Sequence, residues 1–232
     1  MRYCGIAPLG PRHLQLAVVE EVRDPDPPIR LMASFFEPGS AGELATQLRL
    51  WEGELVVALG APADPEAGER SCDAMLAELG VGPARPSAEL GALVDELSGL
   101  ERFVPEDEGA GVVGEGAYAA APLIETSADG VFCALQNRRL PARRHPLGIQ
   151  LRIAELEAEQ VMDDGGDLWQ RRIEELEAAA VALCAHRYAV GHASWLGGPD
   201  GVIVLPGSAP PERFETRGVV PPVERLPLAG SQ

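Results

Sequence analysis

Five arginines lie close together in a chain that is otherwise strongly acidic. They fall within 15 residues, in and just after the segment RRLPARRH, and are Arg138, Arg139, Arg143, Arg144 and Arg152. Guanidinium groups suit bidentate contacts with phosphate oxygens, so this cluster is a candidate phosphate-binding segment. The alternative is that these arginines form salt bridges with the acidic surface or contact another subunit.

Three glutamates stand where a helix or a strand would position them. Glu174 and Glu177 are three residues apart in a helical stretch and therefore share one face of that helix. Glu125 comes at the end of the short predicted strand PLIET. Each has a simpler interpretation, because a helix face is often solvated and a carboxylate at a strand end can cap a helix.

Charge and cysteine content narrow the class of protein. Acidic residues number 36 against 19 basic residues, all of them arginine, and the formal net charge is −17. A field this negative repels polyanions, so a general nucleic-acid coat protein is not expected, although a local basic patch can still bind a phosphate. The four cysteines are widely spaced, which favours reduced thiols in a cytoplasmic protein. The apolar runs are too short for a membrane span, so we expect no membrane partner.

The first third of the chain predicts an antiparallel meander followed by a parallel strand. Strands are expected over residues 3–7, 13–22 and 29–36, with the turn segment DPDPP between the second and the third. A helix over about 41–50 then leads to LVVAL at 55–59, an apolar run typical of a buried central strand. We expect that strand to run parallel to the first.

The rest of the chain predicts helices separated by loops. Shorter helical segments are expected over 71–79, 87–100 and 128–135, and longer helices over 147–161 and 168–190. Asp167 is the expected N-cap of the last helix, and residues 105–116 are expected to form a mobile acidic loop. A final strand is expected over 201–206. We therefore predict one domain over residues 1–206 and an irregular, proline-rich tail over 207–232.

Four blocks of sequence resemble, in the same order, a family of predicted nucleases. The blocks are GIA at 5–7, LVVALGAPADPEAGERSCDAMLAELG at 55–80, PLIETSADGVFCAL at 122–135 and EELEAAAVALCAHRYAVGHASWLGGPDGVIVLP at 174–206. Together they are similar to the predicted ribonuclease H-like nucleases, long classified as a domain of unknown function. The resemblance implies an α/β ribonuclease H-like fold, with a mixed central sheet and helices on both faces.

The resemblance also implies a metal site from which this chain departs. Members of the family carry four acidic positions, a set suited to holding two Mg²⁺ or Mn²⁺ ions for phosphodiester hydrolysis. At two of these positions the chain has Ala7 and Gly60, which offer no side-chain oxygen. The candidates that remain are, for catalysis, Glu125, Glu174 and Glu177 and, for metal binding, Glu125, Glu174 and Asp64.

These departures lead to one hypothesis and two alternatives. The hypothesis is a degenerate, catalytically weak or inactive member of the family that uses no cofactor and binds a nucleotide, a nucleic-acid end or a protein partner. The first alternative is an active nuclease or phosphodiesterase that uses Glu125, Glu174 and Glu177 with Mg²⁺ or Mn²⁺. The second is a structural protein that forms oligomers without a ligand. A homo-oligomer is compatible with all three.

Overall fold

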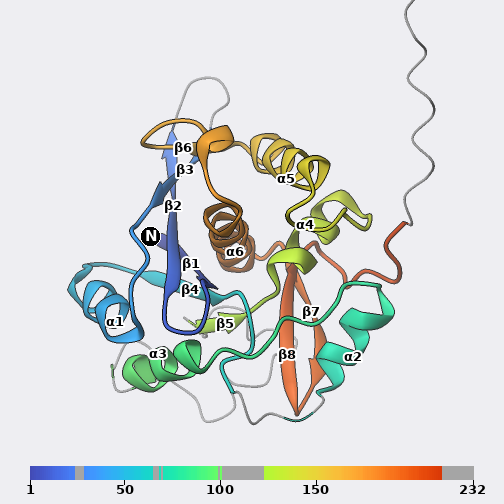
Figure 1. Ribbon diagram of the computed structural model, residues 1–232, viewed down its shortest axis with the longest axis horizontal. Coiled ribbons are helices and arrows are strands. Elements are labelled where there is room, and N and C mark those ends of the chain that lie inside the picture. Colours follow the sequence, from blue (N-terminus) through green and yellow to red (C-terminus); the bar gives the residue numbers. More distant parts are fainter. Residues whose placement is uncertain (24–28, 65–67, 69, 99, 101–122, 216–232) are drawn as a thin grey trace, which may run out of the picture.

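A mixed six-stranded sheet forms the centre of the computed structural model, which describes the chain apart from residues 24–28, 65–67, 69, 99, 101–122 and 216–232 (Figure 1). The strand order is β5-β4-β1-β2-β3-β6. The strands are β1 (Arg2–Pro8), β2 (Leu14–Arg23), β3 (Ile29–Phe35), β4 (Leu55–Leu59), β5 (Leu123–Glu125) and β6 (Val161–Asp163).

The first four strands confirm the arrangement that the sequence predicts. β1 pairs antiparallel with β2, and β2 pairs antiparallel with β3. β4 lies on the other side of β1 and runs parallel to it, with Arg2 opposite Leu55. β5 then continues the sheet in parallel beside β4. As a result, β1, β4 and β5 end at the same edge of the sheet.

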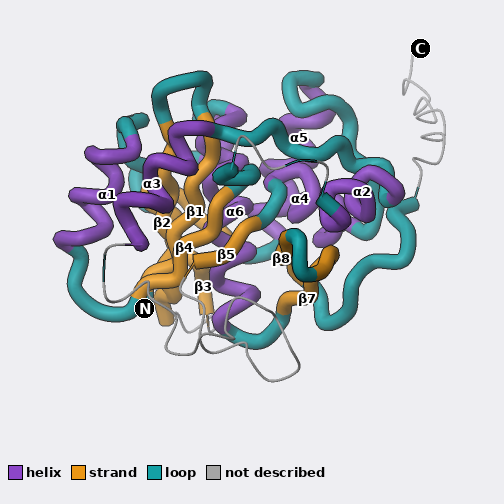
Figure 2. The backbone as a smooth tube through the Cα atoms, turned by 90° about the horizontal axis from the view of Figure 1, so that it is seen from below, coloured by secondary structure: helices purple, strands orange, loops and turns teal. Residues whose placement is uncertain are grey.

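Helices cover both faces of this sheet, so apolar residues alternate between two cores. On one face lie α1 (Ala41–Leu50) and α3 (Ala88–Ser98), and on the other lie α4 (Ala128–Gln136), α5 (Pro146–Ala158) and α6 (Ile173–Ala189) (Figure 2). In β2, Leu16 and Val18 pack toward α1 and α3, whereas Ala17 and Val19 pack toward α6. Both sets are buried, which is why this strand is apolar on both faces at that point.

α6 is the central helix of the molecule and is buried on nearly all sides (Figure 1). Alanines fill much of it, and two of them, Ala178 and Ala182, approach β1 at Gly5. A Cβ atom at Gly5 would lie 2.1 Å from the Ala178 carbonyl oxygen and 2.2 Å from the Ala182 nitrogen. Glycine at this position therefore lets the helix backbone contact the sheet directly.

A separate hairpin lies beyond α6, formed by β7 (Ala193–Gly198) and β8 (Gly201–Pro206). It packs with α2 (Ser71–Glu78) in a third apolar cluster that also holds the buried side chain of Phe214. The Thr126 hydroxyl, just after β5, donates a 2.6 Å hydrogen bond to the Val204 carbonyl and ties the hairpin to the sheet. The first part of the segment predicted as a tail therefore packs against the domain, because Phe214 is buried in this cluster.

The structure corrects two predicted helices. The segment 168–190 is not one helix: Asp167 caps a short 3₁₀ turn (Leu168–Gln170), and α6 begins at Ile173, after an extended Arg172. The helix predicted over 147–161 ends at Ala158, because Gln160 has a positive φ of 62° and the chain then enters β6.

Other differences concern strands and segments with weak sequence signals. The sequence pattern does not predict β6 and β7, which are short or glycine-containing. The loop expected over 105–116 lies outside the described residues. All four cysteines are buried and free, as expected. No helix among the described residues is both long enough and apolar enough to cross a membrane.

Candidate functional site

A pocket of about 350 Å³ opens at the edge of the sheet where β1 and β4 end. In α/β sheets this edge is the usual place for a ligand. Its walls come from the ends of those strands, the loop between α2 and α3, the first turn of α4, the loop before α5, and α6. The lining residues are Ala7, Pro8, Gly60, Ala61, Gly82, Pro83, Ala84, Arg85, Ser127, Ala128, Asp129, Arg143 and Glu177.

Small residues line the pocket where the family resemblance implied carboxylates. Ala7 is buried at the end of β1. A Cβ atom at Gly60 would lie 3.0 Å from Val181 Cγ2 and 3.2 Å from the Ile6 carbonyl oxygen, so even a small side chain is tight there. Both residues therefore form an apolar surface that offers no ligand for a metal ion.

Glu177 is the carboxylate of α6 that faces the pocket. Its Oε2 accepts a 2.6 Å hydrogen bond from Arg143 Nη2, and the same nitrogen lies 3.3 Å from Glu174 Oε1. The side chain of Glu177 is 10% exposed, whereas that of Arg143 is 40% exposed. The prediction that Glu174 and Glu177 share a helix face is confirmed, because both carboxylates contact one guanidinium group.

Burial shifts the titration of Glu177 into the neutral range. Desolvation is the largest cause and raises the pKa of Glu177 to about 7. The positive charges of Arg143 and Arg152 lower this pKa, while the negative charges of Asp129 and Glu174 raise it. A carboxyl group that titrates near neutrality inside a pocket is a feature of functional sites, although buried ion-pair networks also produce it.

The first turn of α4 forms another wall. Ser127 is its N-cap and accepts a hydrogen bond from the Gly130 backbone nitrogen. Because Ser127, Ala128 and Asp129 line the pocket, the amino-terminal end of this helix faces it. Asp129 is held in place by Arg152, whose Nη2 donates a 2.6 Å hydrogen bond to Asp129 Oδ1. Arg152 is itself 1% exposed and also donates to the Gly148 carbonyl.

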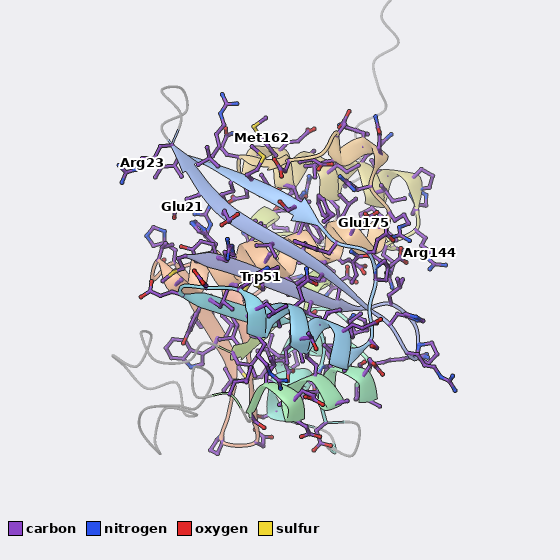
Figure 3. The ribbon with its side chains drawn as sticks, turned by 90° about the vertical axis from the view of Figure 1, so that its left-hand side faces the viewer. Glu21, Arg23, Trp51, Arg144, Met162 and Glu175 are labelled. Carbon is purple, nitrogen blue, oxygen red and sulfur yellow. The ribbon has the colours of Figure 1, made fainter. Side chains whose placement is uncertain are left out.

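The five clustered arginines do not form one patch. Arg143 lines the pocket and Arg152 lies behind its wall, while Arg144 pairs with Glu174 from an exposed position and projects outward (Figure 3). Arg138 donates to the Gln136 side chain, and Arg139 donates to the Leu79 carbonyl. Arg143, Arg144 and Arg152 thus form ion pairs, as the salt-bridge alternative expects, whereas Arg138 and Arg139 hydrogen-bond to neutral groups.

Arg85 is a cation of the pocket that was not among the predicted site residues. It is exposed in the loop between α2 and α3, and no ion pair of Arg85 occurs within the described part of the chain. Asp129 is a second pocket residue that was not among the predicted site residues. A Ser-x-Asp segment directly after a strand is a signal for a capped helix, which would have placed Ser127 and Asp129 at a strand end.

Glu125 lies at the end of β5 but is committed to a different contact, the Arg70 clasp (Arg70, Asp73 and Glu125). Arg70 Nη2 and Nη1 lie 2.6 and 2.9 Å from the two oxygens of Glu125. Arg70 Nε and Nη2 lie 2.8 and 3.1 Å from the two oxygens of Asp73. All three side chains are less than one-fifth exposed, and hydrogen bonds to the carboxylates raise the pKa of Arg70.

The candidate metal ligands are not brought together. Asp64 is exposed and does not line the pocket, and both oxygens of Glu125 are bound by Arg70. Within the described residues, no group of three or more histidine, cysteine, aspartate or glutamate side chains is arranged to hold a metal ion. Of the candidate carboxylates, Glu125 thus belongs to the Arg70 clasp and Glu174 and Glu177 contact Arg143, whereas Asp64 lies in neither cluster.

Comparison with known proteins adds no relative: no family model, curated protein or solved structure matches the chain.

Proposed function

We propose that this protein is a binding protein of the ribonuclease H-like fold whose pocket binds a phosphate-bearing ligand, a nucleotide or a nucleic-acid end, without a metal and without hydrolysis. The observation that carries the proposal is the composition of the pocket: Arg85, Arg143 and the first turn of α4 share one opening whose inner surface holds Ala7 and Gly60. The sheet order, with antiparallel β1, β2 and β3 followed by parallel β4 and β5, supports the fold assignment.

The lining of the pocket is less acidic than the chain as a whole, whose net charge is −17, because Arg85 and Arg143 balance the carboxylates of Asp129 and Glu177, and Asp129 is itself paired with Arg152. Arg85 has no carboxylate partner in the described residues, and 40% of the Arg143 side chain is exposed although two glutamates contact it. The amino-terminal end of α4 adds a partial positive charge, and its first backbone N–H groups are suited to an anionic oxygen. The pocket volume of about 350 Å³ suits a ligand of nucleotide size rather than a folded duplex.

The arrangement of carboxylates argues against two-metal hydrolysis. A pair of Mg²⁺ ions carries four positive charges and needs several carboxylates aimed at one point. In this pocket Asp129 and Glu177 are both paired with arginines, and Glu125 belongs to the Arg70 clasp. The active-nuclease alternative therefore finds no support in the site.

Binding of an oligonucleotide with and without a terminal phosphate tests the proposal. A labelled 5′-phosphorylated oligonucleotide is expected to bind in EDTA, and the matched 5′-hydroxyl oligonucleotide at least about tenfold more weakly, because it lacks the charge-assisted hydrogen bonds to the arginines. With Mg²⁺ or Mn²⁺ present, neither is expected to be cleaved. Equal binding of the two oligonucleotides, or metal-dependent cleavage, would overturn the proposal.

Arg143→Ala and Arg144→Ala form a matched pair for the same assay. Arg143 lines the pocket, whereas Arg144 is 78% exposed outside it, and both contact Glu174. We expect Arg143→Ala to abolish the preference for the 5′-phosphate and Arg144→Ala to leave it within about twofold, since an exposed charge is screened by salt. Equal losses in the two variants would point to a diffuse electrostatic effect and contradict a phosphate site in the pocket.

A further inference from the structure

The guanidinium group of Arg143 already holds an anion that belongs to the protein. Its Nη2 lies 2.6 Å from Glu177 and 3.3 Å from Glu174, and Arg143 and Glu177 both line the pocket. The buried Nε of Arg143 has no hydrogen-bond partner within the described part of the chain. Because that nitrogen is buried, a ligand anion can reach Arg143 only at its terminal nitrogens, close to the Glu177 carboxylate.

We propose that Glu177 competes with the ligand for Arg143 and thereby selects doubly charged anions, so that the pocket accepts a phosphomonoester and rejects a carboxylate or an internal phosphodiester. This inference rests on the proposed function and names the ligand class of the same pocket. Glu177 is a positioning residue in this account, because it acts on the ligand through Arg143.

The selection follows from a balance of charges in a poorly solvated place. A singly charged ligand that displaces Glu177 from Arg143 gains about as much interaction free energy with the arginine as Glu177 loses. The displaced Glu177 carboxylate, whose side chain is 10% exposed, then lies unpaired near the ligand. A dianion carries twice the charge and is therefore attracted more strongly than a monoanion by Arg85 and by the amino-terminal end of α4, where the carboxylate of Asp129 is already paired with Arg152. The displaced carboxyl group can take up a proton from solvent, which removes the repulsion.

The groups around Glu177 support this balance. Arg143 and Arg152 stabilise its ionised form, whereas Asp129 and Glu174 oppose it. Burial already raises the pKa of Glu177 to about 7, and withdrawal of Arg143 by a ligand raises the pKa further. Above pH 7, binding of an anion is therefore expected to be accompanied by uptake of a proton.

The variant Glu177→Gln removes the competing charge while keeping the shape of the side chain. Adenosine 5′-monophosphate and the phosphodiester adenylyl-3′,5′-adenosine are the probes, titrated by calorimetry at pH 8 in EDTA. We expect the wild-type protein to bind the monophosphate and to show no measurable binding of the diester. In Glu177→Gln the affinity for the monophosphate is expected to rise at least about tenfold, and the diester is expected to become a measurable ligand.

Glu159→Gln is the matched control, because Glu159 is another partly buried glutamate that pairs with an arginine, Arg187, but lies outside the pocket. We expect its affinity for both probes to equal that of the wild-type protein. Circular dichroism establishes that each variant is folded before it is titrated.

The pH dependence of sulfate binding tests the same inference on the wild-type protein, without any variant. Sulfate stays fully ionised over the pH range of the experiment, so any change of its affinity with pH comes from the titration of groups on the protein. We expect sulfate affinity to be constant below about pH 7 and to fall by up to about tenfold per pH unit above it, because one proton is taken up.

The possible outcomes separate this inference from the proposed function. If the monophosphate binds the wild-type protein but Glu177→Gln does not tighten it, or sulfate affinity is flat up to pH 8.5, competition by Glu177 is overturned and the binding function stands. If neither probe nor sulfate binds the wild-type protein or Glu177→Gln, both are overturned. Tighter binding in Glu177→Gln together with a pH-dependent sulfate affinity supports the inference.

Discussion

Two clusters in this molecule share one plan, an arginine between two carboxylates, but differ in hydrogen bonding and in exposure to solvent. Arg70 contacts Asp73 and Glu125 in the clasp, and Arg143 of the pocket contacts Glu177, which lines the pocket, and Glu174, which does not. The clasp arginine uses all three nitrogens of its guanidinium group in two bidentate pairs. The pocket arginine reaches both carboxylates through a single nitrogen.

Exposure separates the two clusters further. The Arg70 side chain is 11% exposed and the Arg143 side chain 40% exposed. A saturated, buried pair fixes the positions of α2 and β5, whereas an unsaturated, half-open pair leaves a cation available to a ligand. An arginine between two carboxylates thus stabilises the fold when all its nitrogens are hydrogen-bonded and buried. It is available to a ligand when some of its nitrogens are free and it is exposed to solvent.

Loss of the clasp arginine is expected to have the largest effect on stability. Arg70→Ala leaves two poorly exposed carboxylates without a partner, and we expect the free energy of unfolding to fall by about 3–5 kcal/mol. In contrast, Arg143→Ala is expected to cost no more than about 1 kcal/mol, since its partner Glu177 can become protonated and Arg144 still contacts Glu174. Urea denaturation of both variants measures these two losses in the free energy of unfolding. Equal losses would contradict the distinction between a structural clasp and an open pocket arginine.

The second-largest effect is expected in the pH dependence of stability, which depends on Glu177 of the pocket. The pKa of Glu177 is raised in the folded state, so the folded protein binds this proton more tightly than the unfolded chain. Stability from this group is therefore fully present below the unfolded pKa of about 4.5 and is lost as the pH rises to about 7. We expect wild-type protein to lose up to about 3 kcal/mol relative to Glu177→Gln across that interval.

Denaturation of both proteins between pH 4.5 and pH 8 measures that difference. Other groups with shifted pKa values, such as Glu155 and His186, affect the two proteins equally and cancel in the subtraction. A difference that stays constant with pH would mean that Glu177 titrates normally and is not a buried carboxyl group.

Neutralising a carboxylate of the clasp is expected to lower the stability of the protein, in contrast to neutralising Glu177. Glu125→Gln replaces charge-assisted hydrogen bonds to Arg70 with weaker ones, and we expect a loss of about 2 kcal/mol at pH 7. Glu177→Gln at the same pH is expected to be neutral or stabilising. Thermal unfolding of the two variants side by side provides the readout, and destabilisation by both to the same extent would count against separate roles.

The smallest effect on stability is expected for Arg85, the exposed cation of the pocket. Arg85→Ala is expected to leave the free energy of unfolding unchanged within about 0.5 kcal/mol, because this side chain has no ion pair in the described residues. Its affinity for adenosine 5′-monophosphate is expected to fall roughly fivefold, in keeping with the loss of one exposed charge contact. Unchanged affinity would remove Arg85 from the site.

The sequence predicts the sheet better than it predicts the site. Period-two alternation in residues 14–19 and the apolar run at 55–59 depend on burial alone, and they place β2 and β4 correctly. The boundaries of α5 and α6 depend on local backbone geometry at Gln160 and Arg172, which hydrophobic spacing does not encode. β6 and β7 depend on pairing with distant strands, so their own residues carry little signal.

The site is harder to predict from the sequence than the sheet, because its contacts join distant parts of the chain. The sequence correctly groups Glu174 with Glu177, which are neighbours on one helix. It does not reveal that Arg70, 55 residues before Glu125, binds that carboxylate. Arg85 and Asp129 meet in the pocket through loop and helix packing rather than through any local motif.

Titration of adenosine 5′-monophosphate into the wild-type protein and into Arg143→Ala, by calorimetry in EDTA, tests the central claim most directly. The account predicts saturable binding at one site per chain in the wild-type protein without any metal ion, and loss of that heat in an Arg143→Ala variant that unfolds at nearly the wild-type urea concentration. Binding that requires Mg²⁺, or metal-free binding of equal affinity in Arg143→Ala, would contradict it.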